Sequence, residues 1–251
     1  MRSLVDLRLA RLICRRELGA AFDTPVAWAS LVASVLLVNT AFMNGFFLGG
    51  RLEMTSFFAS MPLFLAVLLP ALSMRLFAEE RKQRTIELLF SLPIRARDAV
   101  LGKFLAAACL FGLFLVGTLP IPLLLTYLGS PDVGAILAGY LGLALLGAEL
   151  LALGLFASAL TSDQLVAFVA AAVPGAALVL LGDPRVTSVL DGLGDDPGRA
   201  LGSDLAALLS PTPAFESFVG GVVAFESLVH LLAFTAFFLW AATRVVDRGR
   251  A

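Results

Sequence analysis

The residues best suited to chemistry lie in one charged segment, Arg75 to Lys103, between two long apolar runs. An acidic pair and a base, Glu79-Glu80-Arg81, are followed by the apolar-rich stretch Thr85 to Phe90. Pro93 ends this stretch, because proline disfavours helix in the residue before it. The segment therefore predicts a short helix flanked by charge.

Ile86, Leu89 and Phe90 follow the i, i+3, i+4 spacing that places side chains on one helical face. An apolar face on a short helix outside the membrane must be buried against something. The residues alone leave two interpretations open: docking into a groove of a partner protein, or resting on lipid headgroups.

Catalytic and metal sites find little support elsewhere in the sequence. His230 is the only histidine, and Cys14 and Cys109 are in a poor arrangement for a disulfide and lack metal-ligand spacing. No phosphate-binding loop occurs, because Arg97 stands where the motif leading to Gly102 requires glycine. We expect no ATP hydrolysis, metal or cofactor on this chain.

Long apolar helices must position the charged segment. Apolar residues make up 59% and charged residues 15% of the 251, against roughly 45–50% and about 25% in soluble domains. The apolar runs approach the 20 or so residues that a helix needs to cross a bilayer core of about 30 Å. We predict an all-α integral membrane protein with six spans, at about 26–48, 55–77, 104–128, 133–160, 165–181 and 226–243.

The remaining segments complete a single transmembrane domain, residues 1–251. We expect an interfacial helix at 2–24, a cytoplasmic segment at 78–103 and an extracytoplasmic loop at 183–225. Six spans place both termini on one side, and the positive-inside rule makes that side the cytoplasm. Of the 18 basic residues, only three then lie outside: Arg51, Arg185 and Arg199. A net charge of −1 without a basic stripe argues against nucleic acid as a partner.

Three polar side chains fall within the predicted spans. Glu149 is near the middle of the fourth, where an ionised side chain costs roughly 2.5–3.5 kcal/mol. It would line a translocation path or a dimer seam, or it would be a protonated or hydrogen-bonded structural carboxylate. Asn39 and Asn44 are candidates for the same path or seam, or for hydrogen bonds between helices.

Several motifs carry a resemblance to a known family. Glu79-Glu80, Thr85-Ile86-Glu87-Leu88-Leu89 and Gly102-Lys103 look like the first cytoplasmic loop of ABC transporter permeases of the type-2 exporter class. The gliding-motility and nitrous-oxide-reductase-maturation branch is the most similar. Arg84 departs from the pattern, because many relatives have glycine there. Further matches are Gly139-Tyr140-Leu141-Gly142, Leu153-Gly154-Leu155-Phe156, Ser158-Ala159-Leu160-Thr161 and Ser210-Pro211.

The resemblance implies a multi-pass permease subunit in a bacterial inner membrane. Its implied partners are two copies of a separate ABC-type ATP-binding subunit, which would bind ATP and Mg, and a second permease copy or a homologous permease. Segment 78–103 would be the coupling helix, a cytoplasmic helix that docks on the ATP-binding subunit. The implied contact residues are Glu79, Glu80, Arg81, Thr85, Ile86, Glu87, Leu88, Leu89 and Phe90.

Export of an unidentified substrate is the function that the resemblance implies. One alternative is a non-transporting membrane anchor or force transmitter, whose 183–225 loop could hold an extracytoplasmic partner. Another is a secondary transporter, for which we would expect several intramembrane charges and a broken helix.

Overall fold

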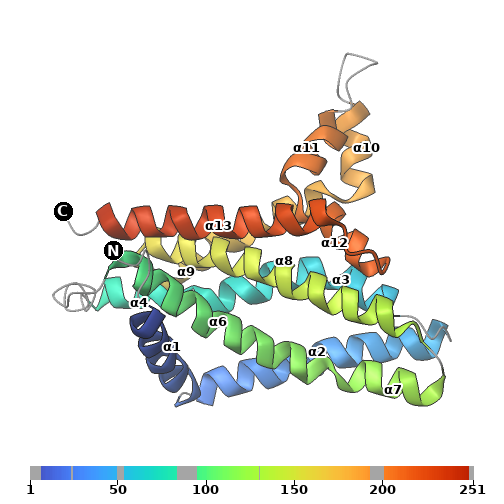
Figure 1. Ribbon diagram of the computed structural model, residues 1–251, viewed down its shortest axis with the longest axis horizontal. Helices are drawn as coiled ribbons and strands as arrows, with labels where there is room; N and C mark the ends of the chain where they lie inside the picture. The colour runs from blue at the N-terminus through green and yellow to red at the C-terminus, as the bar shows by residue number, and fades with distance from the viewer. Residues whose placement is uncertain are drawn as a thin grey trace.

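The computed structural model describes residues 7–23, 25–49, 54–83, 95–129, 131–192 and 201–248. Every regular element in these ranges is an α-helix. The long helices run side by side along the longest axis of the molecule, and the start of α1 and the end of α13 lie at the same end (Figure 1). We call this the terminal end of the bundle.

Five helical stretches among the described residues are long and apolar enough to cross a membrane: 55–82, 96–128, 133–160, 164–181 and 225–248. They comprise α3 (Thr55–Ser73) with α4 (Arg75–Lys82), α6 (Ala96–Thr118) with α7 (Pro120–Leu128), α8 (Val133–Leu160), α9 (Gln164–Leu181) and α13 (Phe225–Arg248). Helix α2 (Pro25–Gly49) holds the first predicted span, but its apolar stretch, Trp28–Asn44, is shorter. A sixth span therefore stays a prediction.

Two of the long helices are interrupted rather than straight. Helix α3 continues through Pro62 and Pro70 and gives way at Met74 to α4, in line with the rule that neighbouring groups in a membrane protein satisfy the carbonyls that proline frees. Helix α6 begins at Ala96, within the segment predicted as cytoplasmic, and ends just before Pro120.

Helix α8 is the centre of the bundle and packs against α3, α9, α12 and α13. Much of its contact surface consists of glycine and alanine, as expected in lipid, where helices associate through close packing rather than hydrophobic burial. A Cβ atom on Gly147 would collide with the ring of Phe111. Close packing therefore explains this glycine without a bound ligand.

Helix α1 (Leu7–Phe22) lies across the terminal end of the bundle, against α6 (Figure 1). Ala10 and Ile13 are buried in this contact. Cys14 lies within hydrogen-bonding reach of Cys109 on α6, and both are free thiols. The structure thus brings the two cysteines together, contrary to the expectation that they are poorly arranged, because α1 folds back across α6.

The predicted extracytoplasmic loop contains three short helices. Helices α10 (Pro184–Gly192) and α11 (Leu201–Leu209) form a hairpin that projects sideways from the bundle (Figure 1). Helix α12 (Pro211–Val219) instead packs into the bundle, where Phe215 and Phe218 are buried in front of Gly142. Part of the expected loop is therefore core.

Candidate functional site

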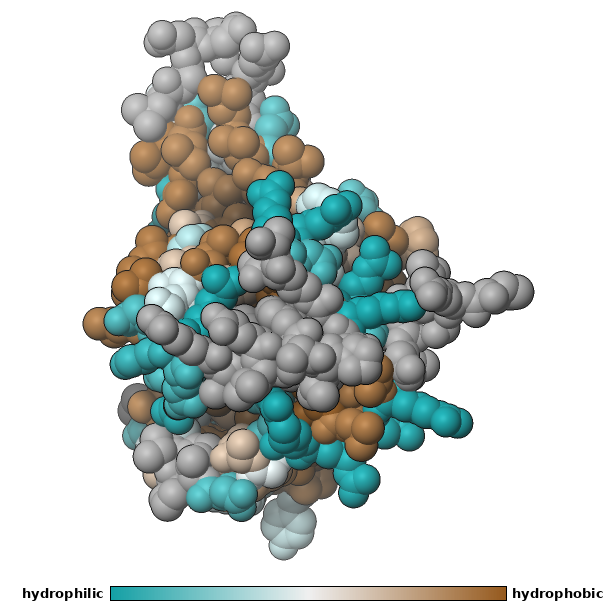
Figure 2. Space-filling view, turned by 90° about the vertical axis from the view of Figure 1, so that its left-hand side faces the viewer, coloured by the Kyte–Doolittle hydropathy of each residue, from teal (hydrophilic) through white to brown (hydrophobic). Residues whose placement is uncertain are grey.

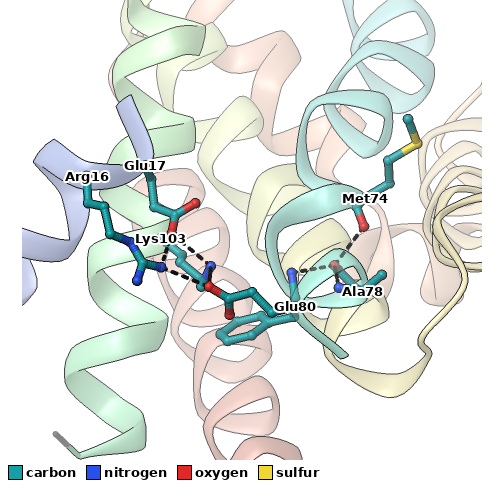
Figure 3. Close-up of polar contacts among 8 residues, drawn as sticks. Arg16, Glu17, Met74, Ala78, Glu80 and Lys103 are labelled. Atoms are coloured by element: carbon teal, nitrogen blue, oxygen red, sulfur yellow. Dashed lines mark hydrogen bonds and ion pairs between the residues drawn. The ribbon is translucent and has the colours of Figure 1, made fainter. Parts of the chain in front are cut away.

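Four charged side chains from three helices meet at the terminal end of the bundle (Figure 3). The Lys103 ammonium on α6 lies 3.0 Å from carboxylate oxygens of both Glu17 on α1 and Glu80 on α4. Arg16 on α1 reaches the same two oxygens, at 2.7 and 2.8 Å. We call these four residues the ion cluster. Cations and anions alternate around it, so each carboxylate oxygen accepts from two bases.

Burial makes Lys103 the centre of the ion cluster. Its side chain is 1% exposed, whereas that of Arg16 is 56% exposed. The ammonium also lies 5.1 Å from the centre of the Phe77 ring, at cation–π distance. Because a buried charge is stable only when it is paired, Lys103 holds α1 and α4, which carry its two carboxylate partners, against α6.

The electrostatics of Glu17 agree with this pairing. Burial on its own would raise the pKa of the Glu17 carboxyl, but the charge of Lys103 and hydrogen bonds from Arg16 and Lys103 outweigh it. The net result is a pKa below the ordinary value of 4.5. The carboxylate is therefore ionised at neutral pH, as the ion pairs require.

Gly102, next to Lys103, is what allows α1 to come this close. A Cβ atom at position 102 would lie 2.8 Å from the Ala10 carbonyl oxygen and 2.7 Å from the Ile13 Cβ. The Gly102-Lys103 motif thus combines two physical roles: the glycine makes room for α1, and the lysine anchors it.

A second polar contact fixes the junction between α3 and α4. The backbone N–H groups of Phe77 and Ala78 donate to the Ser158 hydroxyl on α8, at 3.0 and 3.1 Å. The same hydroxyl donates to the Met74 carbonyl at 2.9 Å (Figure 3). Ser158 therefore caps α4 from a neighbouring helix, supplying the acceptor that a helix start needs.

These contacts surround the segment expected to bind a partner. Glu80 precedes residues 84–94, and Lys103 follows them. Thr85, Ile86, Glu87, Leu88, Leu89 and Phe90 lie outside the described residues, so their docking role stays a prediction. Three residues before this segment, Glu79, Glu80 and Arg81, are also expected to contact the partner. Of these, only Glu80 belongs to the ion cluster. Glu79 accepts a hydrogen bond from Gln83, and the buried Arg81 Nε has no hydrogen-bond partner among the described residues.

The comparisons with known proteins identify the family. A family model described as "ABC-2 family transporter protein" matches residues 31–246. The chain belongs to the ABC-2 transporter family. No curated protein matches it significantly. It is therefore a multi-pass ABC transporter permease, and such a permease implies an ATP-binding subunit as its partner.

Glu149 is enclosed within the helices of the permease and is 1% exposed. It shares a face of α8 with Leu145, which packs against the cluster of Ala214, Phe218 and Leu231, and with Phe156, whose ring lies 6.3 Å from that of Phe238. This face points to α13. Neither carboxylate oxygen has a hydrogen-bond partner among the described residues. Its role in a path or seam stays a prediction.

The structure does not bring Asn39 and Asn44 to Glu149. Asn39 Nδ2 donates to the Gly117 carbonyl of α6 at 3.2 Å, so it links α2 to α6. Asn44 donates to the Thr40 carbonyl of its own helix at 2.9 Å. The described contact of Asn39 is thus a hydrogen bond between helices, one of the two roles considered for it.

The sequence does not predict that Glu17 and Glu80 pair with Lys103, nor that Arg16 joins them. A signal existed, because Lys103 stands among apolar residues in an otherwise membrane-spanning helix. A lysine there demands a carboxylate partner. The sequence does not say which acidic residue supplies it.

Proposed function

We propose that this ABC-2 permease is the membrane half of an exporter powered by a separate ATP-binding subunit. Two copies of that subunit, carrying ATP and Mg, would bind two permease chains, or one chain and a homologue. The permease would have six spans in a bacterial inner membrane, with its termini and segment 78–103 in the cytoplasm. The exported substrate is unidentified, and the motifs favour the gliding-motility and nitrous-oxide-reductase-maturation branch.

The ion cluster is the observation that supports ATP-driven coupling. It ties both flanks of segment 84–94 to each other and to α1 through contacts of 2.8–3.0 Å. Ser158 joins the same region to α8. A partner that displaced segment 84–94 would therefore move α1, α4, α6 and α8 together. A coupling segment requires this kind of mechanical connection to the spans.

The docking step is tested by co-purification from cells that express both subunits. We expect Leu88→Asp and Leu89→Asp to abolish recovery of the ATP-binding subunit with the permease, because both residues belong to the implied contact and a charge buried there is not paired. The control is Leu12→Asp on the exposed face of α1, which should leave recovery unchanged. Full recovery with both Leu88 and Leu89 variants would overturn the docking assignment.

Transmission is tested separately from docking. We expect Glu17→Gln to keep the ATP-binding subunit bound, because Glu17 is outside the implied contact residues, but to reduce permease-dependent stimulation of its ATPase, because one tie to Lys103 is lost. The matched control is Asp247→Asn, because Asp247 is an exposed residue of α13 at the same, terminal end of the bundle. Unchanged stimulation in Glu17→Gln would show that the ion cluster is only structural.

Export itself is tested with the purified complex in sealed vesicles. ATP-dependent movement of a labelled lipid, oligosaccharide, peptide or drug would support an exporter. Coupled ATPase activity without movement of any of these compounds would instead favour the force-transmitting anchor.

A further inference from the structure

The hairpin of α10 and α11 has no role in the contacts described above. Its two helices are held together by Asp191, whose carboxylate accepts from the backbone N–H groups of Gly202 and Ser203, at 2.7 and 3.1 Å. The Ser203 hydroxyl donates to the same carboxylate at 2.7 Å. These hydrogen bonds join α10 to α11, and we call the two helices the arm. The arm extends across the direction of α13 rather than along it (Figure 1).

Helix α11 presents two different exposed surfaces. Gly202 and Ala206 are buried. Beside them, an exposed leucine stripe follows i, i+4, i+7 spacing: Leu201, Leu205 and Leu208 are 47%, 43% and 67% exposed. Ser203 and Asp204 are exposed on the remaining side. This division into apolar and polar faces is typical of a helix that lies at a membrane surface.

The length of α9 indicates where the arm lies relative to the hydrocarbon core of the membrane. Its 18 residues span about 27 Å at 1.5 Å per residue, close to the hydrocarbon thickness of about 30 Å. The helix starts after a polar cap at Asp163 and ends at Leu181, and α10 begins at Pro184. The arm thus leaves the bundle where the hydrocarbon ends. An arm directed sideways at that depth runs along the headgroup boundary.

We propose that the α10–α11 arm rests on the lipid leaflet at the end of the bundle far from the termini, with its leucine stripe inserted at the boundary between headgroups and acyl chains. The proposal rests on the membrane-spanning helices and not on coupling to an ATP-binding subunit. Figure 2 shows apolar residues over much of the arm, above the hydrophilic residues of the terminal end.

Lipid fits this surface better than a second copy of the chain. A stable protein interface buries about 800 Å² on each partner, whereas the stripe offers three leucines on a nine-residue helix with polar residues beside it. Helix α11 also contacts α9, and Leu180, near the end of α9 from which the arm leaves, is exposed as well. An amphipathic element at the interface needs only a narrow apolar face.

Spin labels in the full chain test the position of the arm. Cys14→Ser and Cys109→Ser remove the native thiols. Single labels are then attached through Leu205→Cys and Leu208→Cys on the stripe, and through Asp204→Cys on the polar side, because Asp204 is exposed and takes no part in the hydrogen bonds to Asp191. In phosphatidylcholine–phosphatidylglycerol vesicles, the ratio of collisions with oxygen to collisions with a water-soluble nickel chelate should be several-fold higher at the stripe labels than at the Asp204 label.

Two other results would overturn the proposal, and they differ from each other. High nickel accessibility at all three positions would place the arm in water. Low accessibility to both reagents at the stripe, with spin–spin broadening, would show contact with a second copy. Because the ATP-binding subunit is absent, either result leaves the proposed coupling untouched.

Discussion

Single residues at the terminal end carry contacts that reach across several helices. Among the described residues, Lys103 is the only basic side chain that is buried, and it is shared by two carboxylates. Ser158 uses its one hydroxyl for three backbone groups. Gly154 lies one turn before Ser158, and a side chain at this position would collide with Ser73. Each of these positions tolerates few residue types, for a different physical reason.

Removing the carboxylates of the ion cluster should be non-additive. Glu17→Gln and Glu80→Gln should each lower the free energy of unfolding in detergent by about 1 kcal/mol, because Lys103 keeps one partner. The double variant should lose about 3–5 kcal/mol, because a buried ammonium is then unpaired. A double variant equal to the sum of the single ones would show that Lys103 does not depend on this pair.

Two glycines provide a matched test of packing. Gly154→Ala should lower the free energy of unfolding by about 1–3 kcal/mol, because the new Cβ would collide with the Ser73 hydroxyl. Gly112→Ala on α6 meets no atom within 4 Å and should raise stability by about 0.5–1 kcal/mol through helix propensity. Thermal unfolding of both variants in one detergent measures the difference. Equal shifts would contradict the tight α3–α8 contact.

Among the helical elements, α1 and the α10–α11 arm lie across the bundle rather than along it (Figure 1). Both depend on polar contacts: α1 on the ion cluster, and the arm on Asp191. Single substitutions at these polar residues should therefore weaken the attachment of each element.

Oxidative cross-linking reports whether α1 is docked on α6. A mild oxidant such as diamide should join Cys14 to Cys109 within one chain, detected by mass spectrometry. Burial, and then the neighbouring Cys109, raise the pKa of the Cys14 thiol. Since the thiolate is the reactive form, the cross-link should form slowly at neutral pH and faster as the pH rises. Cys109→Ser is the control, and the absence of any cross-link would mean that α1 is not seated as described.

The arm should be sensitive to acid through Asp191. Hydrogen bonds from the Ser203 hydroxyl and from the backbone of Ser203 and Gly202 lower the pKa of this carboxyl below 3.8. A lowered folded-state pKa gives stability that is present above the ordinary pKa and lost as the pH falls through the folded value. A spin label on α11 should therefore become more mobile as the pH is lowered below 3.8, the ordinary pKa of an aspartate.

Two variants separate this effect from general acid sensitivity. Asp191→Asn should make the label mobile already at neutral pH and largely insensitive to acid. Asp204→Asn changes the charge of the same arm without touching these hydrogen bonds, and it should behave like the unaltered chain. An identical acid response in the Asp191 variant would assign the transition to another group.

The whole molecule is a bundle in which α2 runs along one edge, in contact with α6 and α3 (Figure 1). The ion cluster holds α1 at the end where α13 finishes. Helix α2 starts directly after α1 and reaches the other end before α3 begins. This arrangement supports a sixth span, because the chain has to cross the length of the bundle between α1 and α3.

Labelling with a membrane-impermeant maleimide tests the six-span topology. In a chain without its native cysteines, Ser188→Cys on the arm should react in intact cells. Arg11→Cys on α1 and Asp247→Cys on α13 should react only after the membrane is opened, because both positions would be cytoplasmic. Labelling of the Arg11 variant in intact cells would reduce the number of spans to five.

The sequence by itself determined the membrane character and, to within one residue, the bounds of α2, α8 and α9, because span length and apolar runs are local properties. Helix α8 has the bounds of its predicted span, 133–160. The sequence also drew attention to Gly102-Lys103 and Ser158, without their partners. Only the tertiary structure decided those partners, because Lys103 and Glu17 are 86 positions apart, and Ser158 and Met74 are 84 apart. Contacts at such separations depend on how helices cross, which no local pattern records.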